Sequence, residues 1–243
     1  MTDFFISDLH LSEARPRVTR GFFQFLRETA SGARALYILG DLFDAWVGDD
    51  DDTGLALDTQ TALKALSETG TELYLMRGNR DFLLGKAFTD ATGAQFLDDP
   101  SRIDLAGCPT LLMHGDSLCT HDQAYMAFRE QMQSPDWQKT MLAKPLDERR
   151  ELAWQLRAQS RTMNSNKAAD IMDVTPEEVR RVMLNYGALR LIHGHTHRPD
   201  RHAVTLDDQG AQGERIVLGD WHELGWCLRV ARTRLSLESW PLD

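Results

Sequence analysis

Short runs of apolar residues recur along the chain, and each run ends in polar residues. Six runs extend over only four or five residues, too few for a stable helix. They lie at residues 4–7, 35–39, 72–76, 110–113, 189–192 and 215–218. A short apolar run bounded by polar residues is typical of a buried strand. Residues 225–232 and 233–240 instead alternate apolar and polar positions, which predicts a terminal hairpin.

Three segments between these runs carry apolar residues at helical spacing, and each segment ends at a glycine. They are residues 19–32, 61–70 and 175–187. In the first segment, one face would carry Phe22, Phe25, Leu26 and Thr29. The third would start with Thr175 as its cap and Pro176 in its first turn. Strands that alternate with helices predict an α/β fold in which helices are layered on a largely buried sheet.

One stretch of the chain breaks this rhythm. From about residue 118 to residue 172 no strand-like run occurs, and the pattern is helical throughout. We interpret residues 118–172 as a helical insertion, a lid over the ends of the strands. The core would then consist of residues 1–117 and 173–243. A length of 243 residues fits one large domain with such an insertion.

Composition excludes several classes of protein. The formal net charge of −10 argues against a uniformly basic nucleic-acid surface, so we expect no nucleic-acid partner. Three cysteines without a CxxC pair argue against a disulfide framework or a cysteine zinc site. The first ten residues lack the basic and apolar regions of a signal peptide, and no apolar stretch approaches the ~20 residues that span a bilayer. We therefore expect a cytoplasmic protein.

Residues that ligate metals follow five of the apolar runs, where the strands would end. They are Asp8, His10, Asp41, Asn79, His114, His195 and His197. The carboxyl ends of strands meet at one edge of an open α/β sheet, so we expect these side chains to converge. Seven oxygen and nitrogen ligands exceed the needs of one tetrahedral zinc and suit two divalent cations, with Asp41 as a candidate bridge. Two cations about 3.5–4 Å apart can promote an in-line displacement at phosphorus.

Each residue also has a simpler interpretation when it is taken alone. Asn79 could be a turn residue, His114 a core histidine, and Asp44 a helix cap or a partner of a ligand. We interpret His193 as a core residue, and three other histidines as surface residues or supports of the site: His121, His202 and His222. The acidic run at residues 48–54 is most simply a solvated loop, although its nearness to Asp41 leaves a supporting role open. The fixed order of all five strand ends favours the metal site.

The pattern DxH, GDxxD, GN, H and GHxH resembles that of the calcineurin-like metallophosphoesterases and covers nearly the whole chain. The third block reads "GNRD", so Arg80 stands where that family usually has a histidine taken as a general acid. In this respect the chain resembles the bacterial UDP-2,3-diacylglucosamine pyrophosphatases of lipid A biosynthesis. The stretches that carry this likeness are "ISDLHL", "LYILGDLFDAWVGDDD", "GNRDFLLG", "MHGDSLCTHD", "IMDV" and "LIHGHTHRP".

The resemblance implies a sandwich of β-sheets flanked by helices, with a helical lid. It implies hydrolysis of UDP-2,3-diacylglucosamine to 2,3-diacylglucosamine 1-phosphate (lipid X) and UMP, by a hydroxide that two Mn²⁺ ions activate and that attacks the phosphorus next to the nucleoside. One ion would be held by Asp8, His10, Asp41 and His197, and the other by Asp41, Asn79, His114 and His195. The substrate contacts would be Asn79, Arg80, Asp122, Ser160, Asn164, Lys167 and His195. Of these, Asn79 and Arg80 would stabilise charge on the phosphoryl oxygens.

The insertion combines apolar stripes with a concentration of basic residues. They are Lys139, Lys144, Arg149, Arg150, Arg157, Arg161 and Lys167. Such a surface could meet anionic headgroups and shelter acyl chains, so we expect peripheral contact with the cytoplasmic face of the inner membrane. Ordinary helix packing is the alternative for any one stripe. Two other functions stay open: a phosphoesterase for cyclic nucleotides or dinucleoside polyphosphates, and a non-catalytic scaffold.

Overall fold

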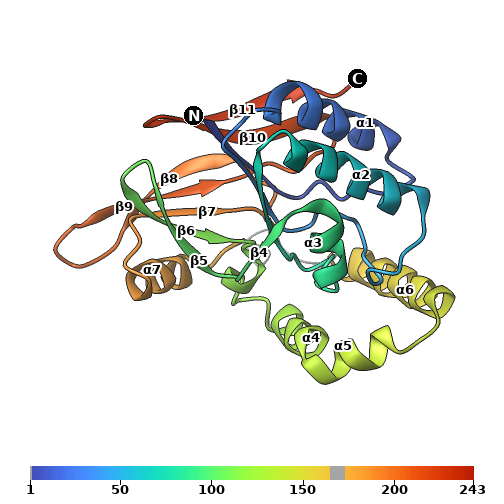
Figure 1. Ribbon diagram of the computed structural model, residues 1–243. Helices are drawn as coiled ribbons and strands as arrows, with labels where there is room; N and C mark the ends of the chain where they lie inside the picture. Colours follow the sequence, from blue (N-terminus) through green and yellow to red (C-terminus); the bar gives the residue numbers. More distant parts are fainter. Residues whose placement is uncertain (1, 165–172) are drawn as a thin grey trace.

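Two β-sheets form the centre of the protein in a computed structural model, which describes residues 2–158 in full, the backbone of residues 159–164, and residues 173–243 (Figure 1). The first sheet has the strand order β11-β10-β1-β2-β3-β4. Its strands are β1 (Thr2–Ile6), β2 (Ala35–Leu39), β3 (Glu72–Met76), β4 (Gln95–Leu97), β10 (Leu224–Ala231) and β11 (Arg234–Pro241). The second sheet has the order β5-β6-β7-β9-β8. Its strands are β5 (Ser101–Leu105), β6 (Cys108–Met113), β7 (Arg190–His193), β8 (Asp200–Thr205) and β9 (Gln212–Val217).

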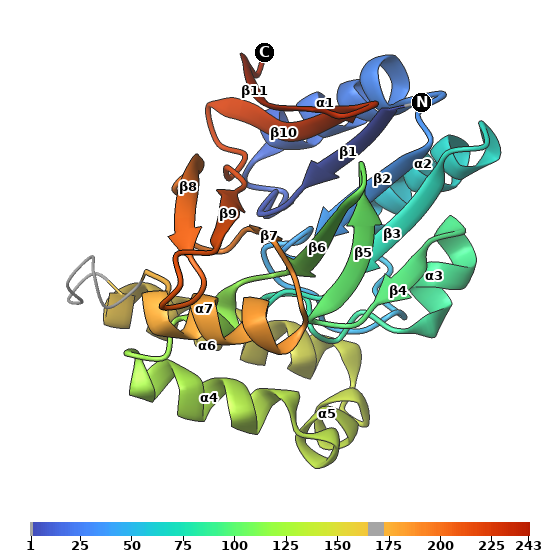
Figure 2. The ribbon, with the colours of Figure 1, turned by 90° about the vertical axis from the view of Figure 1, so that its left-hand side faces the viewer.

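Side chains that alternate along the strands build three separate cores. On β2, Leu36 and Ile38 face the helices α1 (Pro16–Phe25), α2 (Gly54–Glu68) and α3 (Lys86–Thr92). Tyr37, between them, packs in the core between the two sheets, together with Leu112 and Ile216 of the second sheet. The outer face of the second sheet packs against α7 (Pro176–Asn185). Because successive side chains of a strand point to opposite faces, the result is a layered sandwich of helix, sheet, sheet and helix (Figure 2).

The predicted strands and the terminal hairpin are confirmed. They lie in two sheets, so the sandwich of β-sheets flanked by helices that the resemblance implies is confirmed, whereas the apolar pattern alone had suggested a single buried sheet. Three strands and one helix were not predicted: β4, β5, β8 and α3. β4 has only three residues. β5 and β8 are edge strands in which exposed positions alternate with more buried ones, so they carry no continuous apolar run.

The predicted helices exist with different boundaries. α1 continues as a π-helical turn, Leu26–Ala30, which is wider than an α-helical turn, so Ala30 is buried and Thr29 is exposed, contrary to prediction. α2 begins at Gly54, earlier than predicted, because Thr53 caps it by accepting a hydrogen bond from the Ala56 N–H. Thr175 precedes α7 as predicted, but its hydroxyl accepts from Thr120 and not from its own helix.

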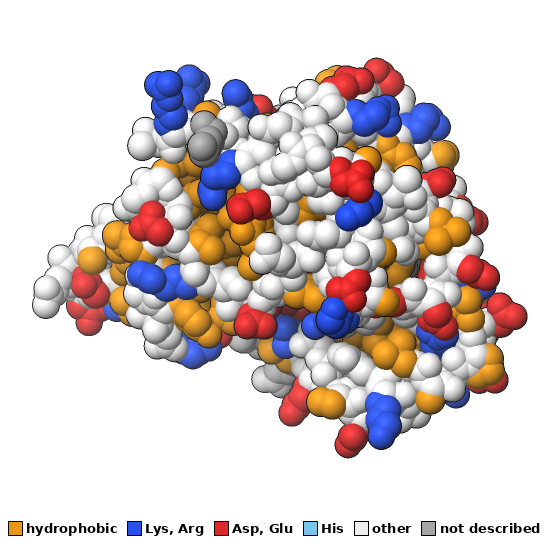
Figure 3. All heavy atoms as spheres, in the orientation of Figure 1, with side chains coloured by type: hydrophobic (Ala, Val, Ile, Leu, Met, Phe, Trp, Pro, Cys, Tyr) orange, Lys and Arg blue, Asp and Glu red, His pale blue; other side chains and the backbone are white. Residues whose placement is uncertain are grey.

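Residues 123–164 are helical, as the pattern predicts. They form α4 (Gln123–Gln133), α5 (Pro135–Leu142) and α6 (Leu146–Asn164), which gather at one end of the two sheets (Figure 2). No helix in the described part of the chain has the length and apolar character needed to cross a membrane. On the face drawn in Figure 3, basic and acidic side chains are interspersed.

The acidic loop that precedes α2 attaches α6 to the core. The buried guanidinium of Arg149 donates to the Val47 carbonyl (2.6 Å) and to the Asp50 carboxylate. Arg150 donates to Asp51 and Asp52, at 2.6 Å each. The acidic loop therefore attaches α6 to the core, and its support of the candidate ligand Asp41 stays a prediction. Two of the basic residues expected to face headgroups, Arg149 and Arg150, thus pair with carboxylates of the core. The side chains of Arg161 and Lys167 lie outside the described residues.

Candidate active site

Loops that follow strands of both sheets bring the seven candidate ligands into one cluster. In its first half, His197 Nε2 lies 3.2 Å from His10 Nε2 and 3.4 Å from Asp8 Oδ1. His10 Nε2 and Asp8 Oδ1 are 3.9 Å apart. These three side chains each offer one ligand atom within 4.8 Å of the others, so they can share one cation.

The second half of the cluster is centred on Asn79. Its Oδ1 lies 2.9 Å from His114 Nε2 and 3.0 Å from His195 Nδ1. Asp41 lies between the two halves, because its Oδ1 is 3.7 Å from His114 Nε2 and its Oδ2 is 3.7 Å from His10 Nδ1. This arrangement matches the division into two ion sites that the resemblance implies. The assignment of ligands to ions stays a prediction.

The backbone of the cluster adopts a conformation that L-residues rarely take. Seven described residues other than glycine have a positive φ, and five of these are candidate ligands: Asp8, His10, Asp41, His195 and His197. A left-handed residue of this kind costs of the order of 1–3 kcal/mol and persists only where the surrounding structure enforces it. The strain is therefore concentrated at the cluster, as is typical of functional sites.

Glycines let these loops approach one another. A Cβ at Gly78 would collide with the backbone N and the carboxylate of Asp41. A Cβ at Gly194 would collide with Ser7 and with the carboxylate of Asp8. Both positions therefore require the absence of a side chain, which explains why each stands beside a candidate ligand.

Neighbouring groups orient the ligand atoms. His114 Nδ1 donates to the Leu39 carbonyl (2.9 Å), and this bond turns Nε2 towards the cluster. Asp8 Oδ2 accepts from Ser7 Oγ (2.6 Å) and from the His195 N–H (2.8 Å), which leaves Oδ1 for the cluster. His197 Nδ1 lies 3.6 Å from Asp220.

Sequence reasoning missed Asp220 and Asp81. Asp220 follows the sixth apolar run in the same Gly-Asp order as Gly40 and Asp41, so a signal was present. Asp81 is fully buried, and its carboxylate accepts four backbone N–H groups. Two of these donors, Leu42 and Gly78, lie at 2.7 Å. Asp81 thus fixes the loop that carries Asp41.

The charges of the cluster fit divalent cations. Burial raises the pKa of Asp41, and it lowers the pKa of His10 and that of His195, the latter to about 4. Burial would also raise the pKa of Asp8, but His197 outweighs this effect and holds the pKa below its ordinary value. Asp8 Oδ1 and His10 Nδ1 are buried without hydrogen-bond partners in the described structure. Burial would lower the pKa of His114, but Asp41 and Asp116 outweigh burial and raise this pKa to about 9, and Asp8 likewise raises that of His197. A divalent cation that binds here would therefore displace protons from these two imidazoles.

Arg80 places a cation beside this cluster. Its backbone N–H donates to Asp41 Oδ1 (2.9 Å), and its Nε lies 3.4 Å from Asp41 Oδ2. The guanidinium also donates to Asp44, which accepts in addition from Arg157 of α6. Asp44 is therefore a partner of arginines and not a helix cap, since α2 begins only at Gly54.

The remaining candidate substrate contacts come from the insertion. Asp122 caps α4 by accepting from the Tyr125 N–H (3.1 Å). Ser160 and Asn164 lie on α6, but their side chains, like all of Lys167, lie outside the described residues. The Tyr125 ring packs 5.9 Å from the ring of His195, and its hydroxyl donates to Asp116.

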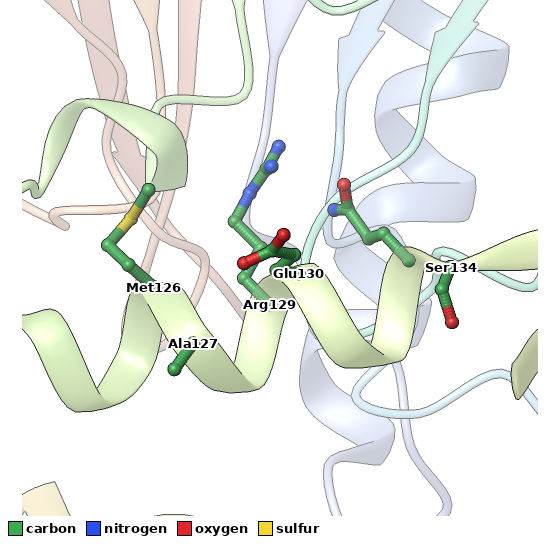
Figure 4. Close-up of a pocket in the computed structure, with 6 residues that line it drawn as sticks. Met126, Ala127, Arg129, Glu130 and Ser134 are labelled. Carbon is green, nitrogen blue, oxygen red and sulfur yellow. The ribbon is translucent and has the colours of Figure 1, made fainter.

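An open hollow of about 660 Å³ runs along α4, and none of the residues that line it is a candidate ligand (Figure 4). Arg129, which lines this hollow, donates from its guanidinium to the Asp116 carboxylate at 2.7 Å. His193 is buried with Nδ1 donating to the Gly194 carbonyl, as predicted for a core residue. His121 and His222 are exposed and His202 is partly exposed, which agrees with their interpretation as surface residues.

Comparisons with known proteins agree with this geometry. The model of the calcineurin-like phosphoesterase family matches residues 2–199. A UDP-2,3-diacylglucosamine hydrolase of Cellvibrio japonicus is 55% identical over 100% of both chains. Proteins of the same name from Azotobacter vinelandii and Marinobacter nauticus are 51% and 50% identical over 100% of this chain and 100% and 99% of their own. The chain therefore belongs to the calcineurin-like phosphoesterase family.

Proposed function

We propose that this protein hydrolyses the diphosphate bond of UDP-2,3-diacylglucosamine and releases 2,3-diacylglucosamine 1-phosphate and UMP, a step of lipid A biosynthesis. The observation that carries the proposal is identity of 50–55% to three proteins named for this substrate, over the whole chain. This span includes residues 118–172, the proposed lid, as well as the ligand cluster. A cluster that serves only as a scaffold would not need seven intact ligands.

The proposed cofactor is a pair of Mn²⁺ ions, one held by Asp8, His10, Asp41 and His197 and the other by Asp41, Asn79, His114 and His195. Bound divalent cations would supply Lewis acidity to the phosphoryl oxygens and lower the pKa of water. The carboxylate of Asp41 would contribute to both positions. Asp41→Ala should therefore lose both equivalents of manganese in a metal analysis, whereas retention of two would contradict the assignment.

The residues of the chain itself orient the diphosphate. The guanidinium of Arg80, next to Asp41, would neutralise charge that develops on the phosphoryl oxygens, together with the amide of Asn79. The leaving lipid phosphate is a weak base, so a side chain that protonates it is dispensable. Arg80→Ala should lower kcat strongly and leave the metal content intact.

An apolar groove beside these residues suits an acylated substrate. It has a volume of about 450 Å³ and runs between α6 and the loops that follow His10 and Asp41. Its walls include Leu11, Phe43, Val47, Leu55, Ala153 and Trp154. Trp154 is 63% exposed. We propose that this side of α6 also rests on the cytoplasmic face of the inner membrane, which co-sedimentation with anionic vesicles would test.

Hydrolysis in ¹⁸O-labelled water, followed by ³¹P NMR, tests the reaction. The expected result is label in UMP, because water attacks the phosphorus next to the nucleoside. Label in the lipid phosphate would show attack on the other phosphorus. Turnover of cyclic nucleotides or dinucleoside polyphosphates, without turnover of the UDP-lipid, would refute the proposed substrate.

A further inference from the structure

Asp44 lies between two guanidinium groups that come from distant segments. Arg157 of α6 donates through Nη2 to Asp44 Oδ1 (2.9 Å) and through Nε to Oδ2 (3.4 Å). Arg80, after β3, donates through Nη1 to the same Oδ1. Asp44 itself follows β2. The Asp44 carboxylate therefore connects three parts of the structure: the loop that carries Asp41, Arg80 beside the cluster, and α6 of the insertion.

This contact constrains Arg80 at both ends of its guanidinium. Nε faces Asp41 and Nη1 faces Asp44, so the plane of the group is fixed relative to the ligand cluster. The side chain of Arg80 is 22% exposed, so its contacts with these carboxylates help to hold it in place. Without the carboxylate, Arg80 and Arg157 would repel each other across the position that Asp44 now occupies.

We propose that Asp44 is a positioning residue for hydrolysis, because it holds the guanidinium of Arg80 at the ligand cluster and couples that group to α6 through Arg157. The inference rests on the proposed function, in which Arg80 faces the substrate diphosphate. Asp44 does not contact the cluster and acts through Arg80.

The protonation state of Asp44 is consistent with this role. Burial would raise the pKa of its carboxyl, but Arg157 and Arg80 outweigh burial and hold the pKa below its ordinary value. The carboxylate is therefore ionised at neutral pH, and both ion pairs persist there. A neutral amide of the same shape would lose both pairs and preserve the packing.

The test compares Asp44→Asn with Asp52→Asn in the manganese-loaded protein, using UDP-2,3-diacylglucosamine as the probe. Asp52 is the matched control, because it also pairs with an arginine of α6, Arg150, and does not line the apolar groove. We expect Asp44→Asn to lower kcat by about 10- to 100-fold, the effect of a misplaced charge, with KM and metal content within threefold of wild type. Asp52→Asn should keep the wild-type kcat.

A double-mutant cycle separates positioning from a structural role. If Asp44 acts through Arg80, the variant with both Asp44→Asn and Arg80→Ala should be no slower than Arg80→Ala alone. The inference would be overturned if the losses of kcat in the two single variants multiply in the double variant. Loss of metal from Asp44→Asn, or an unchanged kcat in that variant, would also overturn it. Asp44→Glu, which keeps the charge, should recover part of the kcat, and it serves as the test if the amide variant does not fold. A normal kcat in Arg80→Ala would instead refute the proposed role of Arg80 itself.

Discussion

Replacing Asp81 by alanine removes the carboxylate that accepts four backbone N–H groups around the Asp41 loop. The bonds from Leu42 and Gly78 are 2.7 Å long, and those from Asp41 and Phe43 are 3.3 and 3.4 Å. A hydrogen bond to a charged group contributes about 1.5–3 kcal/mol, so the two short bonds alone amount to about 3–6 kcal/mol. We expect the free energy of unfolding of Asp81→Ala to fall by at least about 3 kcal/mol.

Urea denaturation followed by circular dichroism, with EDTA present, measures this loss without a contribution from bound metal. Manganese titration should show affinity lower by about 10- to 100-fold, because groups that orient ligands have effects of this size. The control is Asp90→Ala, whose exposed carboxylate pairs with Lys86 one turn away. Its effect should stay under about 0.5 kcal/mol. A variant Asp81→Ala within 1 kcal/mol of wild type would refute the reasoning.

Three further substitutions test other parts of the structure. Arg149→Ala leaves the Val47 carbonyl and Asp50 without their donor and should lower the free energy of unfolding by about 2–4 kcal/mol in urea titrations; a loss under about 1 kcal/mol would mean that α6 is held by other contacts. Gly78→Ala forces Asp41 to move and should reduce manganese content in metal analysis, whereas full loading would contradict the close approach. Burial would raise the pKa of Asp116, but His114 and Arg129 outweigh it and lower the pKa to about 2. The folded pKa lies below the ordinary value of 3.8, so the stabilisation is present above about pH 4 and is lost as the pH falls towards 2. The stability difference between wild type and Asp116→Asn, in EDTA, should therefore shrink from pH 7 to pH 3, and a constant difference would argue against it.

The ligand cluster was predictable because its residues stand at the ends of apolar runs, where strand geometry brings them together. Asp8, Asp41 and His114 each follow such a run directly or within two residues. The contact partners of the carboxylates that support the cluster were not predictable in this way. Asp81 accepts from Leu42, and Asp44 pairs with Arg80 and Arg157. These partners lie far away along the chain, so the spacing of residues does not predict the contacts.

The pattern of apolar and polar positions also could not predict the number of sheets. The runs of β1 and β6 are similar in length and composition, yet Phe5 and Leu112 face each other across the space between two sheets. Periodicity shows which side chains are buried and not which layer buries them. Only the resemblance to a family implied a sandwich. The short strands β4, β5 and β8 escaped because edge strands need few apolar residues.

The candidate ligands come from loops of both β-sheets, so an ion bound by them would link the two sheets. Asp8, Asp41 and Asn79 extend from the first sheet, whereas His114, His195 and His197 extend from the second. Elsewhere the inner faces meet through apolar side chains, which resist separation but do not fix register. An ion bound here would hold the first sheet against the second. At a concentration a hundred times its Kd, it would raise the free energy of unfolding by about 2.7 kcal/mol. Removal of the ion by a chelator would then weaken the whole interface between the two sheets, and not only the loops that hold the ion.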